Sequence, residues 1–168
     1  MEIQTAMIEL IPIDLPNLRR LAAGESVEFG AIATPEGALP PRYVALRAVV
    51  ALDGGTPAPW CVPYLMMPKS RDAIFGACGF KAAPVHGEVE ISYGVAPSER
   101  RRGIATAAVG QLLDLANSSG MVKQVVANVL PENQASASLL RRLGFSIGES
   151  FIDLDGENVI RWSRSVGR

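Results

Sequence analysis

Residues 85–120 read V-H-G-E-V-E-I-S-Y-G-V-A-P-S-E-R-R-R-G-I-A-T-A-A-V-G-Q-L-L-D-L-A-N-S-S-G, and the rest of the chain is interpreted outward from this stretch. Apolar and polar side chains alternate from Glu88 to Val95, as in a strand with one buried face. Pro97 has no N–H to donate and predicts the end of the strand. After Gly103, apolar residues recur at helical spacing, at Ile104, Ala108, Leu112 and Leu115. We therefore predict a strand, a short basic loop and a helix.

The loop between this strand and this helix has the composition of an anion-binding site. The first turn of a helix carries unpaired N–H groups and the positive end of the helix dipole, which together stabilise a phosphate. Gly103 and Ala105 leave room for an anion to approach the backbone, and neighbouring guanidinium groups add charge. The candidate ligand-binding residues are Arg100, Arg101, Arg102, Gly103, Ile104, Ala105 and Thr106. A solvated run of charge is the alternative interpretation of the three arginines.

Two motifs carry a family resemblance. The sequence R-R-R-G-I-A at residues 100–105 fits the R/Q-x-x-G-x-G/A signature of the GNAT superfamily of acyl-CoA-dependent N-acetyltransferases. Further on, P-E-N-Q-A-S at residues 131–136, followed by L-G-F at 143–145, resembles the N-x-x-S…L-G-F segment of one branch of that superfamily. This branch contains the RimJ- and RimL-like enzymes, which acetylate the N-termini of proteins, including ribosomal proteins. The close resemblance covers residues 85–151, and the N-terminal half matches only in its order of elements.

The resemblance implies an α/β (α+β) architecture, the GNAT fold. In that fold a mixed, mostly antiparallel sheet of about six to seven strands is flanked by about four helices and splayed between the fourth and fifth strands. We expect one domain over residues 1–168. From residue patterns we predict strands at residues 6–11, 60–67, 71–81, 88–95, 121–129, 145–154 and 157–163. Helices are predicted at residues 14–23, 42–52, from 104 onward and from 131 to 143. Gly76 and Gly79 predict a bulge or a close contact within their strand.

The resemblance also implies a reaction, the transfer of an acetyl group from acetyl-CoA to a primary amine in a ternary complex. The amine belongs to a protein N-terminus or to a small molecule. Main-chain groups near Tyr93, Gly94 and Val95 are expected to pair with the pantetheine arm, and the Val95 N–H to polarise the thioester carbonyl. Asn133 matches the asparagine that hydrogen-bonds this arm, and Ser136 matches a serine near the thiol. Helix capping is the alternative role of Asn133.

Acetyl transfer needs a neutral amine, and an ammonium ion has a pKa well above neutrality, so a general base is expected. Glu90 is the first candidate and Glu88 the second, because both lie on the polar face of the predicted strand; solvated carboxylates are the alternative. Many family members carry a tyrosine as general acid where this chain has Leu140. We therefore assign no general acid: either Ser136 or water protonates the leaving thiolate, or the thiolate leaves without an acid. Tyr93 is assigned to the core.

Composition excludes several other classes of protein. The net charge of −1 over 168 residues provides no global field for nucleic acid or an anionic membrane. His86 is the only histidine, and two cysteines, Cys61 and Cys78, form no zinc-site spacing and no disulfide framework, so no metal is predicted. No signal peptide and no membrane-spanning run is visible, which makes the cytoplasm the default expectation.

The expected partners are therefore acetyl-CoA and an amine acceptor, with no nucleic acid and no membrane, in a monomer or a homodimer. Two other functions stay open at this stage. The first is a non-catalytic acyl-CoA-binding module of GNAT fold with a sensing role, which the Leu140 departure allows. The second is a nucleic-acid or partner-binding protein that uses Arg100 to Arg102, which lacks interleaved aromatic residues and a basic net charge.

Overall fold

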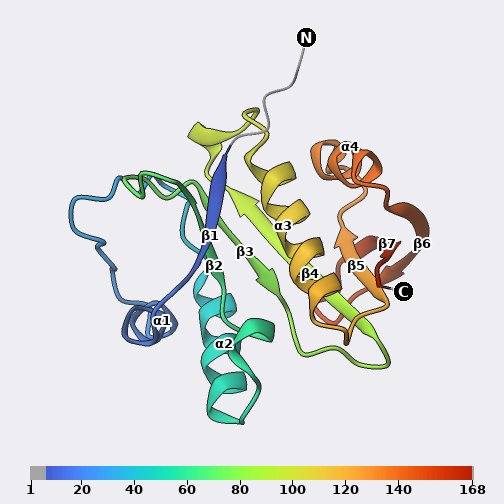
Figure 1. Ribbon diagram of the computed structural model, residues 1–168, viewed down its shortest axis with the longest axis horizontal. Helices are drawn as coiled ribbons and strands as arrows, with labels where there is room; N and C mark the ends of the chain where they lie inside the picture. Colours follow the sequence, from blue (N-terminus) through green and yellow to red (C-terminus); the bar gives the residue numbers. More distant parts are fainter. Residues whose placement is uncertain (1–6, 168) are drawn as a thin grey trace.

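A single mixed sheet of seven strands forms the frame of the computed structural model, which describes residues 7–167 (Figure 1). The strand order across the sheet is β1-β2-β3-β4-β5-β7-β6. The strands are β1 (Ile8–Pro12), β2 (Tyr64–Pro68), β3 (Gly76–Phe80), β4 (Glu88–Val95), β5 (Gln124–Val129), β6 (Ser146–Ile152) and β7 (Asn158–Ser165). The helices are α1 (Leu15–Ala22), α2 (Arg42–Asp53), α3 (Ile104–Ser118) and α4 (Gln134–Arg142), with short 3₁₀ turns η1 (Ala58–Trp60) and η2 (Pro97–Glu99).

The sheet opens between its fourth and fifth strands. Strands β4 and β5 form the parallel pair, whereas β1–β2, β2–β3, β3–β4, β5–β7 and β6–β7 are antiparallel. The parallel register joins Glu88 to Gln124, Val89 to Val125 and Glu90 to Val126, and then stops. Residues 91–95 of β4 therefore have no partner on β5, which confirms the predicted splay.

The helices cover both faces of the sheet. On one face, α3 buries Ile104, Ala108 and Leu112 in a hydrophobic cluster with Val89 and Ile91 of β4, and α4 contributes Leu139 and Leu140 to the same cluster. On the other face, α1 and α2 pack against Leu65 and Met67 of β2. The alternation predicted for β4 is therefore the alternation between these two faces.

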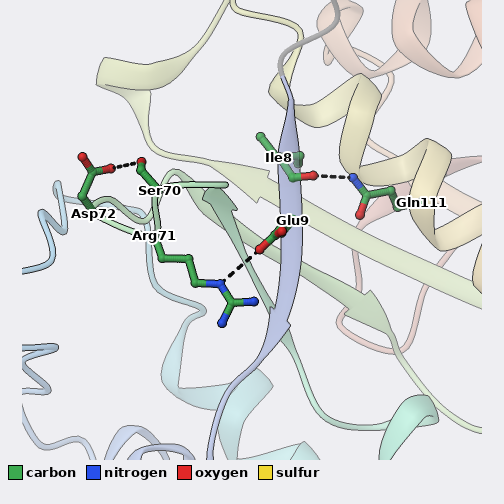
Figure 2. A network of polar contacts seen from close by, with 6 residues as sticks. All are labelled: Ile8, Glu9, Ser70, Arg71, Asp72 and Gln111. Carbon is green, nitrogen blue, oxygen red and sulfur yellow. Dashed lines mark hydrogen bonds and ion pairs between the residues drawn. The ribbon is translucent and has the colours of Figure 1, made fainter.

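The edge strand β1 is tied to its neighbours by side chains as well as by the sheet. Figure 2 shows Gln111 of α3, whose Nε2 donates to the Ile8 carbonyl oxygen at 2.9 Å, and Arg71, whose Nε lies 3.1 Å from Glu9 Oε2. Arg71 lies in the turn between β2 and β3. These contacts fix β1 to α3 and to the turn between β2 and β3.

Several predicted boundaries need correction. The strand predicted from residue 60 begins at Tyr64, because Trp60 is the last residue of the 3₁₀ turn that begins at Ala58. The strand predicted from residue 71 begins at Gly76, since Arg71 has a left-handed backbone with φ of 56°. The strand predicted from residue 121 begins only at Gln124.

The last helix and the first strand differ from prediction at their starts. Helix α4 begins at Gln134 instead of residue 131, because Asn133 caps it. The first residue of the strand predicted at 6–11 lies outside the described residues, and β1 runs from Ile8 to Pro12. The terminal hairpin around the Asp155–Gly156 turn is confirmed.

Gly76 marks a close approach of two strands, as predicted. A Cβ atom at this position would lie 2.2 Å from the Gly94 carbonyl oxygen of β4. At Gly79 the nearest atom would be the Cα of Pro63 at 3.5 Å, an ordinary contact. Gly76 is therefore the position where β3 requires the absence of a side chain.

We predict that Gly76→Ala lowers the free energy of unfolding by more than about 2 kcal/mol, because the backbones of β3 and β4 must separate. Gly110→Ala is the matched control, since a Cβ there meets nothing within 4 Å. Because Gly110 lies within α3, alanine should stabilise by up to about 1 kcal/mol. Urea unfolding measures both, and equal stability of the two variants would contradict the close approach.

Candidate active site

The main-chain groups of β4 point alternately toward β3 and away from it. In an antiparallel pair, a residue that exchanges hydrogen bonds with its partner alternates with one that faces the other way. Lys81 N donates to the Glu90 carbonyl oxygen at 2.9 Å, and Ala96 N donates to the Phe75 carbonyl oxygen at 2.8 Å. Even-numbered residues from 90 to 96 therefore direct their main-chain groups at β3.

The odd-numbered residues face the opening in the sheet. Tyr93 and Val95 direct their N–H and C=O groups toward the side that β5 has left, because the β4–β5 register ends at Glu90. The Val95 carbonyl accepts a hydrogen bond from Arg100 Nε at 3.3 Å, and its N–H stays free for a ligand. Gly94, which we had grouped with Tyr93 and Val95, directs its main-chain groups at β3 instead.

The loop after β4 presents free amides at the start of α3. Gly103 is the N-cap with φ of 75°, and no side chain caps the helix there. The bond from Ala107 N to the Gly103 carbonyl oxygen at 3.1 Å closes the first helical turn. The N–H groups of residues 104–106 therefore have no partner within the helix. Arg101 also has a positive φ of 65°, and such alternation curves successive N–H groups into an anion-binding concavity.

The three arginines of this loop have different surroundings. Arg100 bonds the Val95 carbonyl, and Arg101 is exposed without a side-chain partner among residues 7–167. Arg102 pairs with Glu99 and lies over the Phe75 ring at 5.0 Å from its centroid. The charge of Arg102 is thus already engaged, so Arg100 and Arg101 are the arginines free to meet an anion.

Helix α4 begins opposite β4, and its first turn meets a tyrosine. Asn133 Oδ1 accepts a hydrogen bond from Ser136 N at 3.1 Å, so Asn133 caps α4, and its hydrogen bond to the pantetheine arm, which can coexist with the cap, stays a prediction. The Tyr93 hydroxyl oxygen is buried next to Ser136 but makes no hydrogen bond of ordinary geometry with the described residues. Burial raises the pKa of Tyr93, and the contact with Ser136 lowers it by less.

Tyr93 is therefore more than the core residue that we predicted. Its ring packs against the core cluster, but its hydroxyl reaches the helix start where the family resemblance expects the thiol. Leu140, in the position of the usual tyrosine, is fully buried in the core. The sequence pattern could not show that the Tyr93 hydroxyl reaches the start of α4, because this contact depends on how far β4 lies from α4.

The two candidate base residues are both ion-paired. Lys81 Nζ lies 2.5 Å from Glu90 Oε2, and Arg161 approaches Glu88 with Nη1–Oε1 of 3.0 Å and Nη2–Oε2 of 2.6 Å. The hydrogen bonds to Glu88 raise the pKa of Arg161. Both oxygens of Glu88 are occupied, whereas Glu90 keeps Oε1 available, so the geometry favours Glu90.

One polar residue of the opening was missed by sequence reasoning. Asn128 lies on β5 two residues beyond Val126, the last partner of β4, and it shares the face of Glu90. Its Oδ1 is buried and has no hydrogen-bond partner within residues 7–167. A buried amide oxygen of this kind is rare and needs an explanation such as a ligand or water. An asparagine within the otherwise apolar strand V-V-A-N-V was the available signal.

A cavity of about 400 Å³ lies against the last residues of β4, with residues 92–95 in its lining. It separates α2 from strands β3 and β4, and its walls include Tyr43, Arg47, Ser92, Gly94 and Arg100. Helix α2 and the segment before it therefore face β4 across this cavity. A cavity of this size accommodates a small ligand or the end of a peptide.

The described residues offer few other chemical groups. Among residues 7–167, no three histidine, cysteine or acidic side chains gather as a metal site would require. Cys61 and Cys78 are unpaired thiols, and burial raises the pKa of Cys78. In the same range, no helix combines the length and the apolar character needed to cross a membrane.

Comparisons with known proteins agree with this geometry. The sequence matches the family described as acetyltransferase (GNAT) domain over residues 13–146. A curated relative, the uncharacterized N-acetyltransferase p20 of Bacillus licheniformis, is 35% identical over 78 residues. This match covers 46% of the chain and 44% of the relative, so less than half of that relative's length is matched.

Solved structures share the fold. RimL, a ribosomal alpha-N-protein acetyltransferase, superimposes with a TM-score of 0.66 at 19% identity, over 99% of this chain and 98% of that one. A phosphinothricin acetyltransferase from Sinorhizobium meliloti, solved with acetyl-CoA, gives a TM-score of 0.64 at 20% identity, over 95% and 89% of the two chains. At these identities the likeness shows the fold, and it confirms the predicted α/β architecture.

The surroundings of Tyr93 predict a shifted titration. Its phenol should lose a proton above the ordinary pKa of about 10, and Ser136→Ala should raise this pKa further by removing the lowering contact. Because the folded protein then holds the proton more tightly than the unfolded chain, stability falls as pH rises above about 10. Carbon-13 NMR of labelled tyrosine measures the titration, with Tyr93→Phe to assign the signal; a pKa at or below the ordinary value would contradict the burial.

Proposed function

The chain belongs to the acetyltransferase (GNAT) domain family, and from this premise we propose that it is an N-acetyltransferase that uses acetyl-CoA. The acceptor is a primary amine, on a protein N-terminus or a small molecule, and both substrates are bound together when transfer occurs. The observation that carries the proposal is the line of free amides from Tyr93 and Val95 to residues 104–106. An acyl carrier with a diphosphate and a polar arm matches that line.

The described residues fit acetyl-CoA in two places. Residues 104–106, with Arg100 and Arg101, supply amides and charge for the diphosphate. Tyr93 and Val95 supply main-chain groups that would pair with the pantetheine arm as with an added strand. When bound, acetyl-CoA supplies an activated acyl group in the form of a thioester.

The side chains then divide the chemistry. Glu90 accepts the proton of the acceptor ammonium, so that a neutral nitrogen attacks the acyl carbon. The Val95 N–H donates to the acyl oxygen, where negative charge develops. A C–N bond forms as the C–S bond breaks, the sulfur leaves with the electron pair of that bond, and the nitrogen releases its second proton, which replaces the proton given to the sulfur. In this proposal Ser136, which has the Tyr93 hydroxyl beside it, donates a proton to the sulfur.

The non-catalytic binding module is the less favoured function. Its support was the absence of a tyrosine at Leu140, and Leu140 is a core residue here. The Tyr93 hydroxyl, which lies next to Ser136, offers another proton donor, from β4 instead of α4. A location in the cytoplasm, a monomeric or homodimeric state, and an acceptor that is a protein N-terminus or a small-molecule amine remain predictions.

The proposed diphosphate site at the start of α3 predicts that Gly103→Val weakens the binding of CoA. A β-branched residue is strained at φ of 75° and covers the amides at the start of α3, so the Kd for CoA should rise at least tenfold. Gly120→Val is the matched control, because Gly120 has φ of 69° near the other end of α3 and open space around it. Calorimetry with CoA measures both. An unchanged Kd for CoA in Gly103→Val, or an equal loss of CoA affinity in Gly120→Val, would contradict the proposed diphosphate site.

The role of Glu90 predicts a pH-dependent loss of activity on Glu90→Gln. The acceptor amine is protonated at neutral pH and neutral at high pH, so kcat/KM should fall about 10²-fold or more near neutrality and by less above the amine pKa. Glu88→Gln is the control, since both oxygens of Glu88 are bound by Arg161, and its profile should keep the wild-type shape. A loss in Glu90→Gln that is equal at every pH would show positioning instead of proton transfer.

A further inference from the structure

The cavity beside β4 has an uneven charge. Of its lining residues, Arg47 and Arg100 are charged, and no lining residue is acidic. The rest of the lining is mostly apolar or small, including Pro40, Val44 and Phe80. A cavity of this kind favours a ligand with an apolar body and a negatively charged group.

Arg47 is available to such a ligand. It follows Tyr43 by one helical turn on α2, so both side chains lie on the helix face that lines the cavity. The Arg47 guanidinium makes no ion pair with any carboxylate of residues 7–167, although Arg19, Arg71, Arg102 and Arg161 all do. An unpaired guanidinium at the wall of an apolar cavity is suited to bidentate binding of a carboxylate.

The acidic residues of the neighbouring strand do not offset this charge. Glu90 is paired with Lys81, and Glu88 is paired with Arg161. These two pairs sum to zero, so Arg47 and Arg100 leave the cleft with a positive surplus. A polyamine, with several ammonium groups, would find no carboxylate among the lining residues.

Arg47 and Arg100 lie near the proposed sites of two different substrates, the acceptor and acetyl-CoA. Arg100 belongs to the loop after β4 and bonds the Val95 carbonyl, which places it beside the proposed diphosphate site. Arg47 comes from α2, on the opposite wall. Building on the proposed function, we infer that the acceptor amine carries a carboxylate, and that Arg47 binds this carboxylate while Glu90 receives the amine. Arg47 is thus a specificity-determining residue.

The experiment compares acceptors that differ only in charge. Alanyl-glutamate, alanyl-glutamine and alanyl-lysine, each as the C-terminal amide, present the same N-terminal amine, and kcat/KM is measured for each with acetyl-CoA. The wild type should prefer alanyl-glutamate over alanyl-lysine by about tenfold or more, the size expected for one charge-assisted hydrogen bond. Free glutamate and spermidine are added: glutamate as the better substrate points to a small-molecule acceptor, alanyl-glutamate to a peptide.

Variants test whether Arg47 is the cause. Arg47→Gln should bring the glutamate-to-lysine ratio near one, and Arg47→Glu should reverse it, with the KM for acetyl-CoA unchanged in both. Arg20→Glu on α1 changes the net charge equally but lies outside the cavity lining, so it should keep the wild-type ratio. Thermal melting of Arg47→Gln, Arg47→Glu and Arg20→Glu checks that each of these surface substitutions leaves the fold intact.

Two kinds of outcome would overturn the inference. Preference of the wild type for alanyl-lysine or spermidine would do so, and so would a ratio unchanged by Arg47→Glu, in particular if the KM for acetyl-CoA rose instead. Calorimetry of the dipeptides on the CoA-saturated protein reads the same preference without turnover. Transfer to the wrong acceptor therefore removes this inference alone, whereas binding of CoA without transfer to any amine removes the proposed function.

Discussion

Three residue pairs join β4 to β5, and the site follows from the point at which this pairing ends. Up to Glu90 the two strands form an ordinary parallel ladder, and beyond it β4 keeps only its β3 partner. Main-chain groups away from water require partners, and a buried group left without one costs about 1–3 kcal/mol. The Tyr93 main-chain groups and the Val95 N–H turn away from β3, and they form the strand edge with which we propose that the acyl carrier pairs.

Around this strand edge, some charged side chains are ion-paired and others are not. The acidic residues of β4 are each matched by a basic residue, and Arg102 is matched by Glu99, so these charges are held in place. The guanidinium groups in the cavity lining, Arg47 on α2 and Arg100 on the loop after β4, have no ion pair among residues 7–167. A Cβ at Gly37 would lie 3.0 Å from Pro97 Cδ, so the segment before α2 packs directly on the turn after β4. The segment before α2 and the turn after β4 are thus neighbours, which is compatible with the proposed direct transfer between two bound substrates.

Sequence reasoning succeeded where a local pattern determines the structure. The alternation in β4, the glycine at 103 and the apolar spacing of α3 predicted a strand, a loop and a helix that the structure contains. The close approach at Gly76 was also predictable, because glycines within a strand favour it. The reasoning failed where partners come from distant parts of the chain. Neither the pairing of Glu88 with Arg161 nor the meeting of Tyr93 with Ser136 has a local signature, since each joins residues on different elements.

Amide hydrogen exchange on β4, with and without CoA, tests the central claim most directly. Ser92 and Gly94 face β3 and should be protected in both states, whereas Tyr93 and Val95 should exchange fast in the free protein and slow at least tenfold when CoA is bound. Protection of all four amides in the free protein, or no change at Tyr93 and Val95 on saturation with CoA, would show that the open strand edge does not bind the acyl carrier.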